Sequence, residues 1–246
     1  MLRRRKGLPD GWVRIVEDHV AIWSVLDDDE RQTIEGASDW LLRRKHWEAA
    51  GGFALTDEIK VTIAVQAALV VLGLGVEEYR EVSAIIVYPT EMQSRGVYAG
   101  PVRGTVVDGV RPVLGEAHDN RGPVLIAWDQ ARDAARYPGR GYNVVFHEFA
   151  HKIDMLDKIV DGTPPLARRV DYERWVAVCT EAYEALREGI ERWPLQPYGA
   201  TNPAEFFAVA TEAFLDVPAI LEQNEPNLYD VLRDFFEQDP AARLRR

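Results

Sequence analysis

VVFHEFAHKID, residues 144–154, places two of the chain's five histidines four residues apart. On an α-helix, residues with this spacing lie on one face, so His147 and His151 can both direct a ring nitrogen at one ion. Glu148 is rotated by about 100° from His147 and can stand beside the ion without binding it. The His-Glu-x-x-His spacing therefore predicts a metal-binding helix with a carboxylate next to the metal.

A catalytic zinc site needs three protein ligands and one open position for water. Asp157 stands where some metalloproteases place a third ligand, but those chains turn at a glycine and Asp154 occupies that position here. If the helix continues, Asp157 points about 80° away from His147, which argues against it as a ligand. Asp154 points only about 20° away, which suits either an acceptor for a ligand's second N–H or a solvated acid at the helix end.

The other candidates for the third ligand are Glu205 and Glu212, seven residues apart in TNPAEFFAVATEAFLD, residues 201–216. This spacing puts them on one helical face. Asn202 as N-cap and Pro203 as first residue predict where the helix starts. Glu205 then falls in the first turn, where the helix end can point into a cleft, although acidic residues also favour this place through the helix dipole. Spacing favours Glu205 over Glu212 only slightly. If Glu205 is the ligand, Glu212 on the same helical face is expected to support the site without binding the metal.

The rest of the chain is interpreted from helical periodicity and turn residues. A strongly apolar stretch starts at Thr56, a candidate N-cap, and stops near Gly73 and Gly75. It predicts a helix buried on most sides at the centre of the core. We expect strands at 82–89 and 122–128, a loop or irregular hairpin at 90–121, and further helices at about 27–47, 170–192, 203–215 and 225–238.

Strands followed by a helical half predict an α+β fold, mostly helical with a small β-sheet. We expect a single domain over residues 1–246. In it, N-terminal helices and the small sheet occupy about 10–130, and the metal-binding helical half occupies about 141–240. A linker-like break is visible only at Asp161 to Pro165, which does not require a second domain.

Composition narrows the class of protein. The 246 residues include 47% hydrophobic and 28% charged residues, ordinary values for a soluble globular chain. A net charge of −11 argues against direct nucleic-acid binding, which needs a basic surface. Short basic runs at Arg3 to Lys6 and Arg243 to Arg246 are interpreted as solvated tails. The most apolar stretch, from Val61 to Val76, is interrupted by Gln66 and is too short to predict a membrane span.

The single cysteine, Cys179, excludes an internal disulfide and fits a reducing compartment. It lies in an apolar helical pattern and is predicted to belong to the core. The N-terminal residues MLRRRKGLPDGW lack the apolar segment of a secretory signal. We therefore expect a cytoplasmic location.

Two segments, HEFAHKIDMLD and YGATNPAEFFAV, resemble the Mlc titration factor A family of bacterial zinc peptidases. The second also resembles the zinc-site segment of the catalytic domain of anthrax lethal factor. The likeness to the first family covers most of the chain and includes GGFALTDEIKVTIAVQAALVVLGLG, AIIVYP, GPVLIAWD and FFEQDPAARLRR. One departure is Lys158, which stands where the family usually has glycine after the first motif.

The resemblance implies a zincin-like fold with one Zn²⁺ per chain, held by His147, His151 and Glu205. It assigns Glu148 as the general base and places the phenol of Tyr198 toward the oxyanion. Members of this family are peptidases of the aminopeptidase type, and the founding member also binds a repressor of glucose-uptake genes.

Three functions follow as expectations. The favoured one is a zinc-dependent peptidase acting on a peptide or protein substrate. The alternative is a regulatory binding protein that sequesters a sugar-responsive transcriptional repressor. A structural zinc domain fits poorly, because a His₂Glu set with an adjacent glutamate is typical of catalysis. The strand at 122–128 is a candidate edge strand for aligning an extended peptide.

Overall fold

The computed structural model describes residues 8–90, 93–99, 106–112, 122–166 and 168–246, the stretches 93–99 and 106–112 as backbone only. Within those residues the helices are α1 (Trp12–His19), α2 (Asp28–Arg44), α3 (Asp57–Val70), α4 (Trp128–Arg136), α5 (Val144–Asp154), α6 (Arg169–Arg187), α7 (Pro203–Asp216), α8 (Pro218–Asn224), α9 (Pro226–Phe236) and α10 (Pro240–Leu244). The strands are β1 (His46–Ala49), β2 (Ala84–Tyr88), β3 (Gln93–Ala99), β4 (Val106–Pro112) and β5 (Val124–Ala127). This helix-dominated chain with a small sheet confirms the predicted α+β class.

The sheet has the order β1-β2-β5, and both pairs are parallel. Ile85 at its centre pairs with Trp47 on one side and Val124 on the other. β5 is therefore an edge strand, as predicted. β3 and β4 form an antiparallel pair within the stretch predicted as a loop or irregular hairpin. The other residues of that stretch, 91–92, 100–105 and 113–121, lie outside the described residues.

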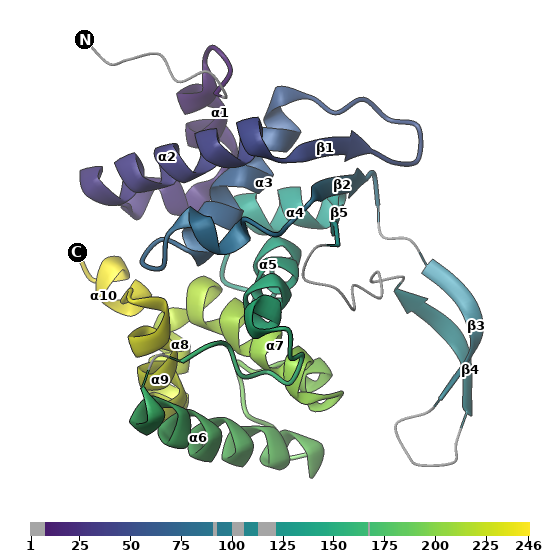
Figure 1. Ribbon diagram of the computed structural model, residues 1–246, viewed down its shortest axis with the longest axis vertical. Helices are drawn as coiled ribbons and strands as arrows, with labels where there is room; N and C mark the ends of the chain where they lie inside the picture. Colours follow the sequence, from purple (N-terminus) through teal and green to yellow (C-terminus); the bar gives the residue numbers. More distant parts are fainter. Residues whose placement is uncertain (1–7, 91–92, 100–105, 113–121, 167) are drawn as a thin grey trace.

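α3 lies at the centre of the core, as predicted, because nearly every residue from Ile59 to Val70 is buried. Thr56 caps its start by accepting a hydrogen bond from the Ile59 N–H at 3.3 Å. The helix ends at Val70, three residues before Gly73. α5 contacts α3, α4 and β5 on one side and α7 on the other. It therefore lies in the middle of the molecule (Figure 1).

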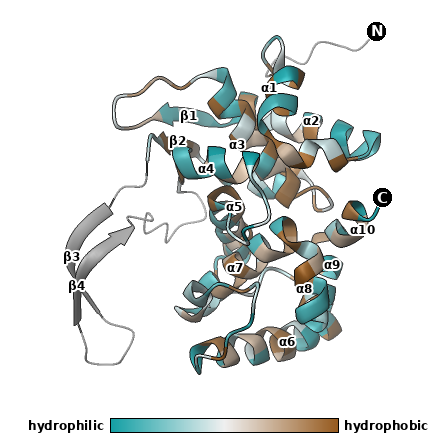
Figure 2. Cartoon of the chain, turned by 180° about the vertical axis from the view of Figure 1, so that it is seen from behind, coloured by the Kyte–Doolittle hydropathy of each residue, from teal (hydrophilic) through white to brown (hydrophobic). Residues whose placement is uncertain are grey.

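Hydropathy follows the same arrangement. Seen from behind in Figure 2, hydrophobic residues are frequent along α5, whereas α4 is mostly hydrophilic. Cys179 on α6 is partly buried and packs against the hydrophobic core, close to the prediction. In the described part of the chain, no helix is both long enough and apolar enough to cross a bilayer.

The predicted helix at 27–47 is too long at its C-terminal end. α2 stops at Arg44, and Lys45 is extended. The Lys45 ammonium donates to the Arg80 carbonyl at 3.1 Å, which draws this residue toward the segment before β2. His46–Ala49 then joins the sheet as β1. The prediction was wrong here because helical periodicity says nothing about a short strand that pairs with a distant partner.

Two other helix ends differ from the prediction. α6 ends at Arg187 and not near Arg192, because Gly189 turns the chain with a φ of +78° and donates to the Leu186 carbonyl at 3.0 Å. α9 ends at Phe236, because Glu237 has a φ of +51°. The helices α1, α4, α8 and α10 are absent from the predicted elements. α8 and α10 are short, and α4 follows β5 without a glycine or proline between them.

The C-terminal basic run is not simply a solvated tail. Arg243 is 2% exposed, and its guanidinium donates to the Glu30 carboxylate at 3.0 Å and to the Gln238 side chain at 3.2 Å. The Gln238 amide in turn donates to the Leu69 and Val70 carbonyls at the end of α3, at 3.1 and 3.2 Å. The prediction was wrong for Arg243, because the chain after α9 packs back onto α2 and α3. Arg3 to Lys6 lie outside the described residues.

Candidate metal centre

α5 carries the two histidines and is fixed at its start by Asn143. The Asn143 side-chain oxygen accepts the N–H groups of Val145 and Phe146, at 3.0 and 3.2 Å. This is an N-cap, which orients the helix by satisfying its free N–H groups. Phe149 and Ile153 are fully buried in the core, while His147 and His151 are directed toward α7.

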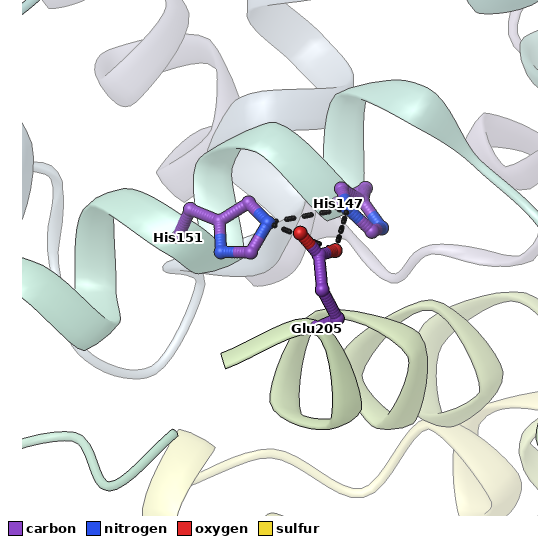
Figure 3. A group of neighbouring side chains, drawn as sticks. All are labelled: His147, His151 and Glu205. Carbon is purple, nitrogen blue, oxygen red and sulfur yellow. Dashed lines mark hydrogen bonds and ion pairs between the residues drawn. The ribbon is translucent and has the colours of Figure 1, made fainter. Parts of the chain in front are cut away.

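α7 begins as the sequence predicts. The Asn202 side-chain oxygen accepts the Glu205 N–H at 3.0 Å, and Pro203 is the first helical residue. Glu205 therefore lies in the first turn. This end of α7 faces α5, so that the Glu205 carboxylate meets the two imidazoles (Figure 3).

Three side chains bring one ligand atom each to a common place: His147, His151 and Glu205. His147 Nε2 is 3.0 Å from Glu205 Oε2 and 3.2 Å from His151 Nε2, and His151 Nε2 is 3.4 Å from Glu205 Oε2. Ligand atoms about 2.0–2.1 Å from a tetrahedral zinc ion are separated by about 3.3 Å. Two imidazole nitrogens and one carboxylate oxygen at these separations fit a catalytic zinc site with one open position.

Glu212 contacts the other nitrogen of His147. Its Oε1 pairs with His147 Nδ1, and its Oε2 accepts the Asn143 N–H at 2.9 Å. With Nδ1–H donating to this carboxylate, Nε2 is the nitrogen free to bind a metal. Glu212 therefore lies on the opposite side of His147 from Glu205. Of the two candidates for the third ligand, Glu205 is the one next to Nε2.

Electrostatics at the cluster follow from burial and these contacts. Burial lowers the pKa of His147, but hydrogen bonds to Glu205 and Glu212 outweigh it and raise this pKa to about 10. Burial raises the pKa of Glu205, yet its hydrogen bonds to both histidines leave it well below the ordinary value. A metal ion would displace the Nε2 proton of His147, so metal binding at neutral pH releases a proton and weakens as the pH falls.

Glu148 follows His147 on α5 and stands beside the cluster. Its Oε1 is buried and has no hydrogen-bond partner among the described residues. Burial raises the pKa of Glu148, against the opposing effect of His147 and His151. An unpaired buried carboxylate oxygen is rare in a folded protein and points to a group that acts on a ligand.

Asp154 and Asp157 lie at the end of α5, and neither belongs to the three-residue cluster. Asp154 is fully buried, and its Oδ2 accepts the Gly162 N–H at 3.1 Å. Asp157 is exposed, and its Oδ1 accepts the Ile159 N–H at 2.8 Å. Asp154 was a candidate to accept the second N–H of a ligand histidine. In the structure Glu212, and not Asp154, accepts this hydrogen bond from His147.

Tyr198 lies in a short 3₁₀ turn, Pro197–Ala200, directly before α7. The centre of its ring is 6.0 Å from that of His147, and the residue is 41% exposed. The phenol is thus next to the cluster and at the surface. This position is compatible with contact to a bound substrate.

Gly162 holds the start of α7 against the end of α5. The sequence indicated only a turn at this residue and not its contact with the two helices. Its N–H donates to Asp154, and its carbonyl accepts the Trp175 indole N–H at 3.3 Å. Its φ is +76°, and a Cβ added here would lie 2.2 Å from the Pro203 carbonyl oxygen. Only glycine fits between Asp154 and the first residue of the helix that carries Glu205.

Gly162→Ala should lower both the stability of the protein and the affinity of the candidate metal centre for added Zn²⁺. Gly189→Ala is a matched control, because Gly189 has a φ of +78° and no atom within 4 Å of an added Cβ. Left-handed backbone alone costs about 1 kcal/mol, which is the loss expected at Gly189. At Gly162 the clash must also move Pro203, and we expect zinc affinity to fall at least about tenfold. Urea unfolding and competition with a chromophoric chelator measure the two effects. Equal results for both variants would contradict this role.

The chain is similar to known proteins over most of its length. A family model described as glucose-regulated metallo-peptidase M90 matches residues 1–237. The uncharacterized protein slr2042 of Synechocystis sp. is 37% identical over 241 residues, which cover 96% of this chain and 86% of the relative. Mlc titration factor A of Pectobacterium atrosepticum is 30% identical over 231 residues, 92% of this chain and 86% of the relative. Mlc titration factor A of Yersinia pestis is 30% identical over 234 residues, 93% and 85% of the two chains.

Proposed function

The chain belongs to the glucose-regulated metallo-peptidase M90 family, and on that premise we propose that it is a zinc-dependent peptidase. His147, His151 and Glu205 are the proposed ligands of one zinc ion per chain. The observation that supports this most directly is the set of separations from 3.0 to 3.4 Å among their ligand atoms. The carboxylate oxygen Oε1 of Glu148, which has no hydrogen-bond partner among the residues that the structure describes, supports hydrolysis as the reaction.

The proposed mechanism assigns a task to each residue. Zinc, when bound, would polarise the scissile carbonyl and lower the pKa of a bound water. Glu148 takes the proton of the attacking water and passes it to the leaving amine. Tyr198 donates a hydrogen bond to the carbonyl oxygen as that oxygen gains charge. Glu212 keeps the Nδ1 proton on His147, so that Nε2 stays directed at the cluster.

Tyr198→Phe tests the proposed donor, because it keeps the ring and removes only the hydroxyl. A hydrogen bond that strengthens as charge develops acts on turnover, so we expect kcat to fall by at least about tenfold with KM little changed. Zinc content and the urea midpoint should equal those of the wild type, since the residue is partly exposed. Full activity in this variant would show that the Tyr198 hydroxyl does not stabilise the charged oxygen.

Substrate alignment is proposed for β5. This strand is at the edge of the sheet and contacts α5, so an extended peptide pairing with it would pass the histidine helix. By the family resemblance, we propose aminopeptidase-type activity on peptide or protein substrates. The lone cysteine still supports a cytoplasmic location as an expectation.

Metal removal tests the proposed function. Purified protein should contain close to one zinc ion per chain and should cleave an aminoacyl p-nitroanilide. Dialysis against a chelator should abolish cleavage, and stoichiometric zinc should restore it. The N-acetylated form of the same substrate distinguishes the aminopeptidase type, which requires a free amine. Cleavage that survives complete removal of the metal would refute the proposal.

A regulatory binding role is the second candidate, favoured by the name of the relatives called Mlc titration factor A. A net charge of −11 would suit a basic DNA-binding domain of a sugar-responsive repressor. Capture from native lysate at low salt with the Glu148→Gln variant tests this role. Recovery of a transcriptional regulator would support it, and loss of that capture at high salt would identify the attraction as electrostatic.

A further inference from the structure

Gln66 is a buried polar residue in the middle of α3, 1% exposed, and both ends of its amide are hydrogen-bonded. Its Nε2 donates to the Thr62 and Ala131 carbonyls, at 3.1 and 3.2 Å. Its Oε1 accepts the Asn143 side-chain N–H at 2.9 Å. A buried amide is tolerated only where such bonds offset the loss of water. Gln66 thus ties α3 and α4 to the residue that precedes α5.

The bond to Asn143 continues toward the histidines. Asn143 caps α5 with its side-chain oxygen, and its backbone N–H donates to Glu212 Oε2 at 2.9 Å. Glu212 Oε1 pairs with His147 Nδ1. Gln66, Asn143, Glu212 and His147 therefore form one continuous hydrogen-bonded chain, which we call the α3–α5 relay. All four residues are buried.

We infer that Gln66 is a positioning residue for the metal centre, acting through Asn143 and Glu212 on His147. The Asn143 side-chain N–H donates to Gln66, and this bond fixes the rotation of the Asn143 amide, which sets the cap of α5. The same bond holds residue 143, and with it the backbone N–H, in place. That N–H holds one oxygen of Glu212, so the other oxygen meets Nδ1 of His147. The inference rests on the proposed zinc site, because its consequence is the direction in which Nε2 points.

Two substitutions break the relay at the same bond from opposite ends. Gln66→Met has a similar volume and leaves the Asn143 side-chain N–H buried without an acceptor. Asn143→Ser keeps a good N-cap for α5 but is too short to reach Gln66. Partners bonded directly to a metal ligand change metal affinity by about 10–100-fold, so we expect about threefold to tenfold weaker zinc binding here, two bonds further away.

Thr62→Val is the matched control. Thr62 lies one turn before Gln66 on α3 and is fully buried, and its hydroxyl has no hydrogen-bond partner among the described residues. The substitution removes a polar atom from the same helix without touching the relay. The backbone carbonyl that accepts from Gln66 is retained. We expect zinc affinity equal to that of the wild type.

The readouts separate positioning from general loss of stability. Zinc affinity is measured by chelator competition under conditions where urea unfolding shows each apoprotein to be folded. The visible absorption of the cobalt-substituted protein reports ligand geometry, and we expect it to change in Gln66→Met and Asn143→Ser only. Turnover should show a lower kcat with KM little changed.

The outcomes distinguish this inference from the proposed function. A wild type that binds no zinc would refute the proposed function. A wild type that binds zinc, with Gln66→Met and Asn143→Ser binding it equally well, would overturn the role of Gln66 alone. Equal losses of zinc affinity in these two variants and in Thr62→Val would also overturn it, because they would reflect a general destabilisation of the core. If one of the two relay variants does not fold, the other decides.

Discussion

Glu148→Gln is expected to keep its zinc and to lose about 10²–10⁴-fold in kcat. The amide has nearly the same shape as the carboxylate, so the packing of α5 should not change. It cannot take a proton, however, and the attacking water would lack its base. The three proposed ligand atoms belong to other residues, so we expect the metal content to stay close to one per chain. Measurement of kcat together with metal analysis separates the two effects.

The same variant supplies its own control against contamination. A contaminating peptidase would survive the substitution unchanged, whereas activity that belongs to this chain should fall. Unchanged kcat in a preparation of full zinc content would show that a group other than Glu148 takes the proton. A fall in zinc content equal to the fall in activity would instead assign Glu148 to metal binding.

Glu205→Ala is expected to have the largest effect on metal binding. Zinc sites are stabilised by about 10–16 kcal/mol in total, so loss of one of three protein ligands should weaken binding on the order of a thousandfold. Asp157→Ala is the matched control, because Asp157 is an acidic residue of the same region whose carboxylate, within the described part of the chain, accepts a hydrogen bond from the Ile159 N–H alone. Its zinc affinity should be nearly that of the wild type.

Glu212→Ala should lie between these two, at about 10–100-fold, because it removes the acceptor of the His147 Nδ1 proton and not a ligand atom. Chelator competition on the three variants gives the order of effects. Loss of zinc in Asp157→Ala with retention in Glu205→Ala would refute the proposed ligand set. A larger loss of zinc affinity in Glu212→Ala than in Glu205→Ala would mean that Glu212 is the ligand and Glu205 the supporting carboxylate.

Local signals in the sequence were sufficient to predict those features of the site that lie within a single helix. The spacing of His147 and His151 and the cap at Asn202 are properties of a few consecutive residues. They are found in the structure as predicted, in α5 and at the start of α7. The buried helix after Thr56 was recognisable for the same reason, since its apolar residues are continuous.

Contacts between helices were not predictable in this way. Asp154 and Glu212 both suit a partner for a ligand histidine by their angle on a helix. Only the packing of α7 against α5 shows that Glu212 meets His147 while Asp154 meets Gly162. The short strand β1 was missed for a related reason, because four residues become a strand only through their pairing with β2.

The return of the chain onto α2 and α3 after α9 has a consequence for the order of folding. Arg243 bonds to Glu30 across 213 residues of sequence, and Gln238 reaches the end of α3 across 169. Contacts of such range form late and slow a folding reaction. While the chain is being synthesised, α3 emerges long before the residues that pair with its final carbonyls. We therefore expect the nascent chain to stay incompletely folded, and open to proteases and chaperones, until Arg243 has left the ribosome.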